Sequence, residues 1–245
     1  MVEKILNFRS VSLEQIAGEL YNFSKIGGFS ISNCMKRSFR EELLKRIKEF
    51  NHSNGSKFRE ARRTQGEITQ EMELFYLEDI GESAFPNNLR GLMGQLRLEY
   101  ADFYKELGKV ASFQRQGLES IGFHHYKKGS IGITPHQDYT TDINLIGSFV
   151  ITGKAPFFIC KDRQKSGAIE LASYPGSLIL MRAARKETEQ PKRPFHYVDK
   201  VKEDRYSLLF RWRTETGLTT RSKIAKEYIQ EYNDEEDPWA GHIVH

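Results

Sequence analysis

Three residues have the types and spacing to bind a transition metal. His136 and Asp138 are separated by one residue, so in an extended segment their side chains lie on the same side of the backbone. His196, much further along the chain, can complete a triangle of ligands from a neighbouring strand. Two imidazoles and one carboxylate on one face of an octahedron suit Fe(II) and leave the opposite face open. The pattern therefore predicts an iron site that is accessible to oxygen and a substrate.

A second pattern predicts a site for a carboxylate. Arg205 and Ser207 are also two residues apart, which aims a guanidinium and a hydroxyl in the same direction from one strand. Such a pair can bind a carboxylate through charge-assisted hydrogen bonds. Arg211 shares the strand parity of Arg205 and Ser207, so we expect its side chain to point inward as well.

The order and spacing of these two motifs resemble the Fe(II)- and 2-oxoglutarate-dependent dioxygenases, most closely the isopenicillin N synthase-like branch. The resemblance covers about residues 121–213, with a weaker match at residues 26–33. It implies a jelly-roll core, the double-stranded β-helix, and oxidation of a substrate coupled to decarboxylation of 2-oxoglutarate to succinate. Because Asp138 is present where related halogenases have a small residue, the resemblance favours oxygenation over halogenation.

The resemblance also implies individual roles and three small molecules: Fe(II), 2-oxoglutarate as cosubstrate, and O2. It places His136, Asp138 and His196 on the metal, and Arg205, Ser207 and Tyr126 on 2-oxoglutarate. The candidates for contact with the primary substrate are Arg211, His124, Arg182 and Arg213.

Three functions are compatible with these motifs. We expect first a hydroxylase or related oxidase that acts on a small polar molecule. The second is an AlkB-type oxidative demethylase of nucleic acid or another macromolecule, because the sequences around residues 136–138 and 205–211 also resemble that group. No paired basic and aromatic strands are expected before residue 121, which argues against nucleic acid without excluding it. The third is a jelly roll that binds a ligand without turning it over.

Length and composition predict one domain over residues 1–245, with residues 1–120 as a mostly helical support and lid, 121–213 as the jelly roll and 214–245 as a C-terminal helix or tail. The two cysteines, Cys34 and Cys160, are too few for a disulfide framework. No apolar run is long enough to cross a membrane, and no secretory signal is visible, so we expect a cytoplasmic protein. The net charge of +4 comes from scattered Lys and Arg and does not identify a partner.

Apolar periodicity predicts the elements that position the motifs, a mainly β fold with flanking helices. Helices are expected after Ser12, after Ser38 and over residues 87–112, with a loop over residues 51–70. A short strand is expected at residues 29–31. Eight further short strands, typical of a sandwich or barrel, are expected at residues 121–126, 131–134, 143–152, 156–160, 168–171, 177–181, 195–199 and 206–213.

Overall fold

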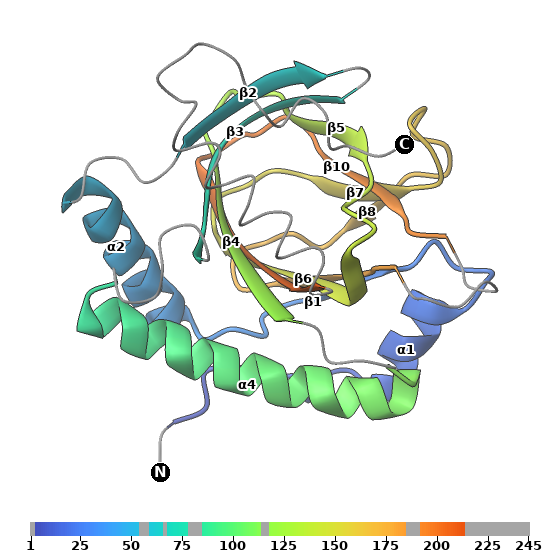
Figure 1. The fold of residues 1–245 in the computed structure, drawn as a ribbon, viewed down its shortest axis with the longest axis horizontal. Helices are drawn as coiled ribbons and strands as arrows, with labels where there is room; N and C mark the ends of the chain where they lie inside the picture. The colour runs from blue at the N-terminus through green and yellow to red at the C-terminus, as the bar shows by residue number, and fades with distance from the viewer. Residues whose placement is uncertain are drawn as a thin grey trace.

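Over the residues that the structure describes, the protein folds as a double-stranded β-helix with helices packed against its larger sheet (Figure 1). The computed structural model describes residues 3–53, 59–65, 68–77, 85–113, 118–184 and 192–213. The helices are α1 (Leu13–Tyr21), α2 (Arg37–Ser53) and α4 (Asn87–Ala111). The strands are β1 (Gly28–Ile31), β2 (Arg59–Gln65), β3 (Ile68–Tyr76), β4 (Leu118–Tyr126), β5 (Gly132–His136), β6 (Asp142–Thr152), β7 (Phe157–Cys160), β8 (Ile169–Leu171), β9 (Leu178–Arg182), β10 (Phe195–Val198) and β11 (Arg205–Arg213).

The strands pair in the order β1-β9-β6-β11-β4-β3-β5-β10-β7-β8, and β2 pairs with β3. The order contains the two four-stranded sheets of a jelly roll, β9-β6-β11-β4 and β5-β10-β7-β8. Strand β3 joins them, because its residues Glu73–Tyr76 pair with β4 while Gln70 and Glu71 pair with β5. All eight strands expected after residue 120 are present, as is the short strand at β1.

The helices cover the outer face of the larger sheet (Figure 1). Helix α1 begins as predicted at Ser12, whose side chain accepts a hydrogen bond from the Gln15 amide. On α4, Tyr100 is fully buried, and its ring lies 5.2 Å from that of Phe149 on β6 and 4.9 Å from that of Phe210 on β11. This packing fixes which face of β6 and β11 points away from the helices.

Strand β11 therefore has two different faces. Leu208, Phe210 and Trp212 pack in the hydrophobic cluster shared with the helices. The alternate residues lie opposite members of a second cluster, inside the barrel: Ser207 is opposite Val150, and Arg211 is opposite Ile146. Residues directly opposite in a ladder point to the same side. The polar residues of β11 consequently point into the barrel, as their spacing predicted.

The main error of the sequence-based prediction concerns residues 51–76, before the first barrel strand β4. Residues 51–70 were expected to be a loop and the region before residue 121 to lack paired strands, but β2 and β3 form an antiparallel hairpin with Arg59 opposite Leu74 and Gln65 opposite Ile68. The hairpin joins the sheet next to β5, so the N-terminal region is not only helical. The helix expected within residues 214–245 lies outside the described residues. Within the described part of the chain, none of the helices has the length and hydropathy to cross a membrane.

Candidate metal and carboxylate site

Strands β5 and β10 bring the three predicted metal ligands together. His136 on β5 lies directly opposite His196 on β10, and their ring centroids are 4.2 Å apart. Asp138 follows β5, and its Oδ2 lies 3.4 Å from His196 Nε2. One potential ligand atom from each residue lies within 4.8 Å of the others. The structure thus forms the predicted triangle of two imidazoles and one carboxylate.

Burial keeps both imidazoles in the neutral form that binds a metal. It lowers the pKa of His136, and it lowers that of His196 to about 3, with His136 as the next contribution. His136 Nδ1 lies 2.9 Å from the backbone carbonyl of Thr134, which can only accept a hydrogen bond. The proton is therefore on Nδ1, which leaves Nε2 with a lone pair for a metal.

Asp138 has one carboxylate oxygen bound by the protein and one without a partner. Its Oδ1 accepts a hydrogen bond of 3.0 Å from Arg211 Nη2, whereas Oδ2 is buried and has no hydrogen-bond partner among the described residues. Burial alone would raise the pKa of this carboxyl, but the charge of Arg211, followed by the two imidazoles, outweighs that effect and holds the pKa below its usual range. Asp138 is therefore an anion with one oxygen free for a cation.

Arg211 and Arg213 form a buried ion-pair network around Asp142. Arg211 Nε lies 3.4 Å from one oxygen of Asp142, and Arg213 Nε donates to the other at 2.7 Å. Asp142, at the start of β6, is completely buried. Both arginines had been predicted to contact the substrate, but in the structure their guanidinium groups bind aspartates. Asp142 had no recognisable motif in the sequence, since its partners come from another strand.

Arg205 is a buried cation with no anion beside it in the described chain. The residue is 1% exposed, and its Nε and Nη2 atoms have no hydrogen-bond partner there. Its guanidinium carbon lies 5.7 Å from the ring centroid of Tyr126, the residue directly opposite it on β4. Burial lowers the pKa of Arg205 because the charged form is desolvated. A bound carboxylate would offset that penalty, so this residue marks an anion site inside the barrel.

Ser207, Tyr126 and His124 lie around that anion site. Ser207 is buried directly opposite His124, two pairs along the ladder from Arg205 and Tyr126 and therefore on the same barrel face. Burial raises the pKa of Tyr126 to about 12, so its hydroxyl stays protonated and can donate a hydrogen bond. His124 packs edge-on against Tyr126, with ring centroids 6.4 Å apart. The structure thus groups the predicted cosubstrate residues with one predicted substrate residue.

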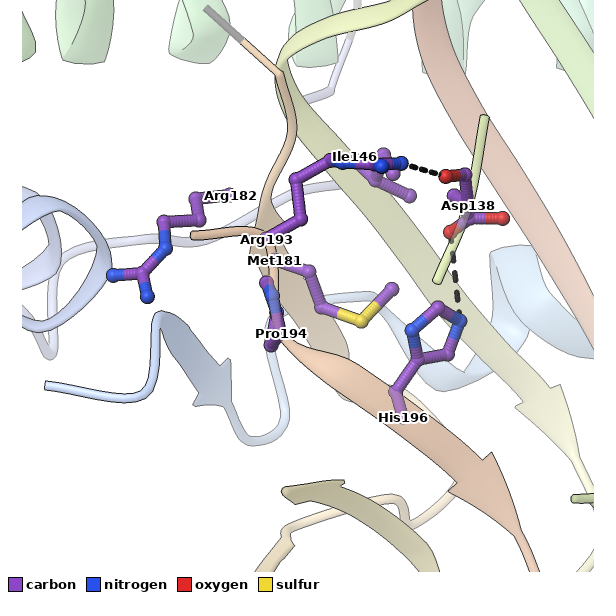
Figure 2. Close-up of a pocket in the computed structure, with 7 residues that line it drawn as sticks. All are labelled: Asp138, Ile146, Met181, Arg182, Arg193, Pro194 and His196. Carbon is purple, nitrogen blue, oxygen red and sulfur yellow. Dashed lines mark hydrogen bonds and ion pairs between the residues drawn. The ribbon is translucent and has the colours of Figure 1, made fainter. Parts of the chain in front are cut away.

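A cavity adjoins the metal ligands (Figure 2). It is lined by Asp138, Ile146, Met181, Arg182, Arg193, Pro194 and His196. Figure 2 shows the Arg193 side chain reaching toward Asp138, where it donates a hydrogen bond to the backbone carbonyl. Sequence reasoning missed Arg193, although its position three residues before a predicted ligand was a usable signal.

Arg182 lines the cavity, but its guanidinium points away from Asp138 (Figure 2). The guanidinium donates to the backbone carbonyls of Leu20, Lys25 and Lys192. Gly27 makes room for it, since a Cβ atom there would lie 2.5 Å from the guanidinium carbon. These contacts give Arg182 a structural role between α1 and β9, and its contact with a substrate stays a prediction.

Comparisons with known proteins identify solved structures with a similar fold. Neither a family model nor a curated protein matches the sequence. The solved structures that are similar include a prolyl-4-hydroxylase from Pseudomonas putida, with a TM-score of 0.60, 11% identity and coverage of 83% of this chain and 100% of that chain. A Trichoplax adhaerens prolyl hydroxylase, in complex with a hypoxia inducible factor peptide fragment, has a TM-score of 0.61, 13% identity and coverage of 83% and 91%.

A third similar structure is the dioxygenase for auxin oxidation 1 from Arabidopsis thaliana in complex with 2-oxoglutarate. Its TM-score is 0.59, with 14% identity over 85% of this chain and 91% of that chain. At these identities the likeness establishes the shared fold. It confirms the predicted double-stranded β-helix, and it does not single out the isopenicillin N synthase-like branch.

Proposed function

We propose that the protein is an Fe(II)- and 2-oxoglutarate-dependent oxygenase. The observation that carries the proposal is the pairing, in one barrel, of a convergent His136–Asp138–His196 triangle with the buried guanidinium of Arg205, whose Nε and Nη2 have no hydrogen-bond partner among the described residues. The first site fits a divalent metal, and the second fits a carboxylate. One of the proteins with a similar fold was solved in complex with 2-oxoglutarate, which agrees with this assignment.

Each residue has a defined task in this reaction. His136 Nε2, His196 Nε2 and Asp138 Oδ2 would hold the metal, while Arg211 keeps the other oxygen of Asp138 in place. Arg205 would bind the distal carboxylate of 2-oxoglutarate, with Ser207 as a hydroxyl donor. When bound, Fe(II) and 2-oxoglutarate supply the capacity to activate O2 and oxidise a substrate.

We propose a small polar molecule as the primary substrate. The cavity beside the metal ligands is lined by the charged residues Asp138, Arg182 and Arg193 together with His196, which suits a polar molecule. A macromolecular substrate, including a nucleic-acid base as in AlkB-type demethylases, is the second candidate. The β2–β3 hairpin favours this alternative more than the sequence did, because it places paired strands beside β5, which carries His136. The similar proteins named above concern a peptide substrate in one case and auxin in another, so the fold alone does not choose.

The proposal is tested by two measurements on the purified protein. Anaerobic titration of the Fe(II)-loaded protein with 2-oxoglutarate should give saturable binding, detected by the absorption of the iron–2-oxo acid chelate. A screen of metabolite pools should then give succinate release that depends on one component. Absence of 2-oxoglutarate binding would contradict the proposal and favour a ligand-binding jelly roll. Tight, salt-sensitive binding of single-stranded DNA or RNA, with demethylation of an alkylated base, would favour the second substrate class.

A further inference from the structure

Arg193 has a different environment from the other arginines near the metal ligands. It lies in the segment that leads into β10, and its guanidinium reaches into the cavity beside Asp138 (Figure 2). In the part of the chain that the structure describes, its guanidinium has one hydrogen-bond acceptor, the backbone carbonyl of Asp138. No described carboxylate oxygen forms an ion pair with it.

The other guanidinium groups around the site have their partners or a proposed use. Arg182 donates to three backbone carbonyls, and Arg211 and Arg213 bind two buried aspartates. Arg205 lies at the site proposed for the cosubstrate carboxylate. Among the described residues, Arg193 is thus the cation at the cavity that forms no ion pair. The charges of Asp138 and Asp142 act on it at longer range, but burial still lowers its pKa, so a closer anion would stabilise the guanidinium.

A hydrogen bond and a following proline hold the Arg193 backbone in position. Its carbonyl accepts a hydrogen bond of 2.6 Å from Gln137 Nε2, and Gln137 is the residue between two proposed metal ligands. Pro194 follows directly, and a residue before proline is restricted to extended conformations. The starting point of the side chain is therefore fixed relative to the metal site, whereas its guanidinium can exchange the Asp138 carbonyl for a better acceptor.

We propose that Arg193 binds a carboxylate group of the primary substrate, so that the enzyme acts on a small carboxylic acid. A planar guanidinium matches a carboxylate through two parallel hydrogen bonds, which would fix both the position and the orientation of the substrate beside the metal. The inference rests on the proposed function only in that the bound acid is the molecule oxidised. The anion site itself can be tested without turnover.

The test uses Mn(II)-loaded protein saturated with 2-oxoglutarate, so that the metal and Arg205 are occupied. The probes are acetate and acetamide, which differ in charge but hardly in size. Paramagnetic relaxation of their methyl protons by bound Mn(II) reports both affinity and proximity to the metal. We expect saturable relaxation of acetate and little of acetamide. Arg193→Gln should weaken acetate binding by about tenfold or more, as for loss of a charge-assisted hydrogen bond.

Lys192→Gln is the matched control, because it removes a neighbouring exposed cation outside the site. It should leave acetate binding unchanged, and Arg193→Lys, which keeps the charge without the planar fork, should bind with intermediate affinity. Equal relaxation of acetate and acetamide, or unchanged acetate binding in Arg193→Gln, would overturn the inference. So would equal weakening by Lys192→Gln.

The two proposals can fail separately. If the wild-type protein does not bind 2-oxoglutarate, the proposed function fails, and the Arg193 site is then judged by saturation transfer from metal-free protein to acetate. Loss of that transfer in Arg193→Gln but not in Lys192→Gln would support the anion site by itself. Equal transfer in all three proteins would overturn it.

Discussion

Replacing Arg205 with Met should weaken 2-oxoglutarate binding without destabilising the ligand-free protein. Met has a similar length but no charge and no hydrogen-bond donors. In the structure, two of the guanidinium nitrogens of Arg205 are buried without partners among the described residues. Each such group destabilises a protein by about 1–3 kcal/mol. The free energy of unfolding of the ligand-free variant should therefore stay the same or rise by about that amount.

The same substitution should sharply weaken 2-oxoglutarate binding. Loss of one partner from a desolvated, charge-assisted pair typically costs about 2–5 kcal/mol. Since about 1.4 kcal/mol corresponds to a tenfold change, the Kd for 2-oxoglutarate should increase by about 30-fold or more. Ser207→Ala, which removes one neutral hydrogen bond of about 1 kcal/mol, should raise the Kd only about fivefold.

Two assays on the same preparations decide the matter. Urea unfolding of the metal-free protein gives the free energy of unfolding, and anaerobic titration of the Fe(II)-loaded protein gives the Kd for 2-oxoglutarate. An Arg205→Met protein that unfolds much more easily but binds 2-oxoglutarate normally would refute the reasoning. That result would mean that Arg205 has a structural partner and that another residue holds the carboxylate.

Four further outcomes are expected. Asp138→Ala should lose measurable Mn(II) binding in calorimetry while it keeps its circular dichroism spectrum, and full turnover by this variant would contradict the metal site. Arg211→Met should lower Mn(II) affinity by about 10–100-fold, because the Arg211 side chain positions one carboxylate oxygen of Asp138 and the substitution releases that oxygen. Because the folded-state pKa of His196 lies near 3, below the ordinary value of about 6.5, the folded state binds fewer protons between these values. The free energy of unfolding of the metal-free protein should therefore fall as pH drops through that window, by as much as about 2 kcal/mol at pH 5. The same decrease should be smaller in the His196→Gln protein. Gly147→Ala should destabilise by about 1–3 kcal/mol, since its Cβ would lie 2.0 Å from the buried Tyr100 hydroxyl, whereas Gly18→Ala, with open space around it, should not.

The barrel could be predicted because its strands are short, apolar and separated by turn residues. Once the strand containing Arg205 and Ser207 was recognised, parity alone placed both side chains inside. The metal triangle followed from the same rule at His136 and Asp138, with His196 on the paired strand. These features depend on local periodicity, which a single sequence contains.

The hairpin was missed because one of its strands has no apolar periodicity. Strand β2 reads Arg-Glu-Ala-Arg-Arg-Thr-Gln, and its pairing with β3 rests on backbone hydrogen bonds, which are independent of side-chain type. Strand β3 did contain a signal, since Ile68, Met72 and Leu74 share one parity and pack in the barrel cluster. An alternating pattern there would have identified at least one strand.

Partners of charged residues could not be predicted for a different reason. Arg211 was expected to point inward, and it does, but its contacts with Asp138 and Asp142 depend on how two other segments end beside it. Arg193 lies in an irregular segment, where no period assigns a direction to a side chain. Such contacts are set by tertiary packing and emerge only from the structure.

The position of β3 between the two sheets has a consequence for how the site can open. One half of this strand is bonded to β5, which carries His136, and the other half to β4, which lies beside the strand of Arg205. The proposed metal and cosubstrate sites are therefore parts of a single hydrogen-bonded ladder rather than of two independent flaps. Local unfolding of β3 would break amide pairs with both β4 and β5. We therefore expect opening of the two halves of the site to be coupled, so that a ligand bound at either half restrains both.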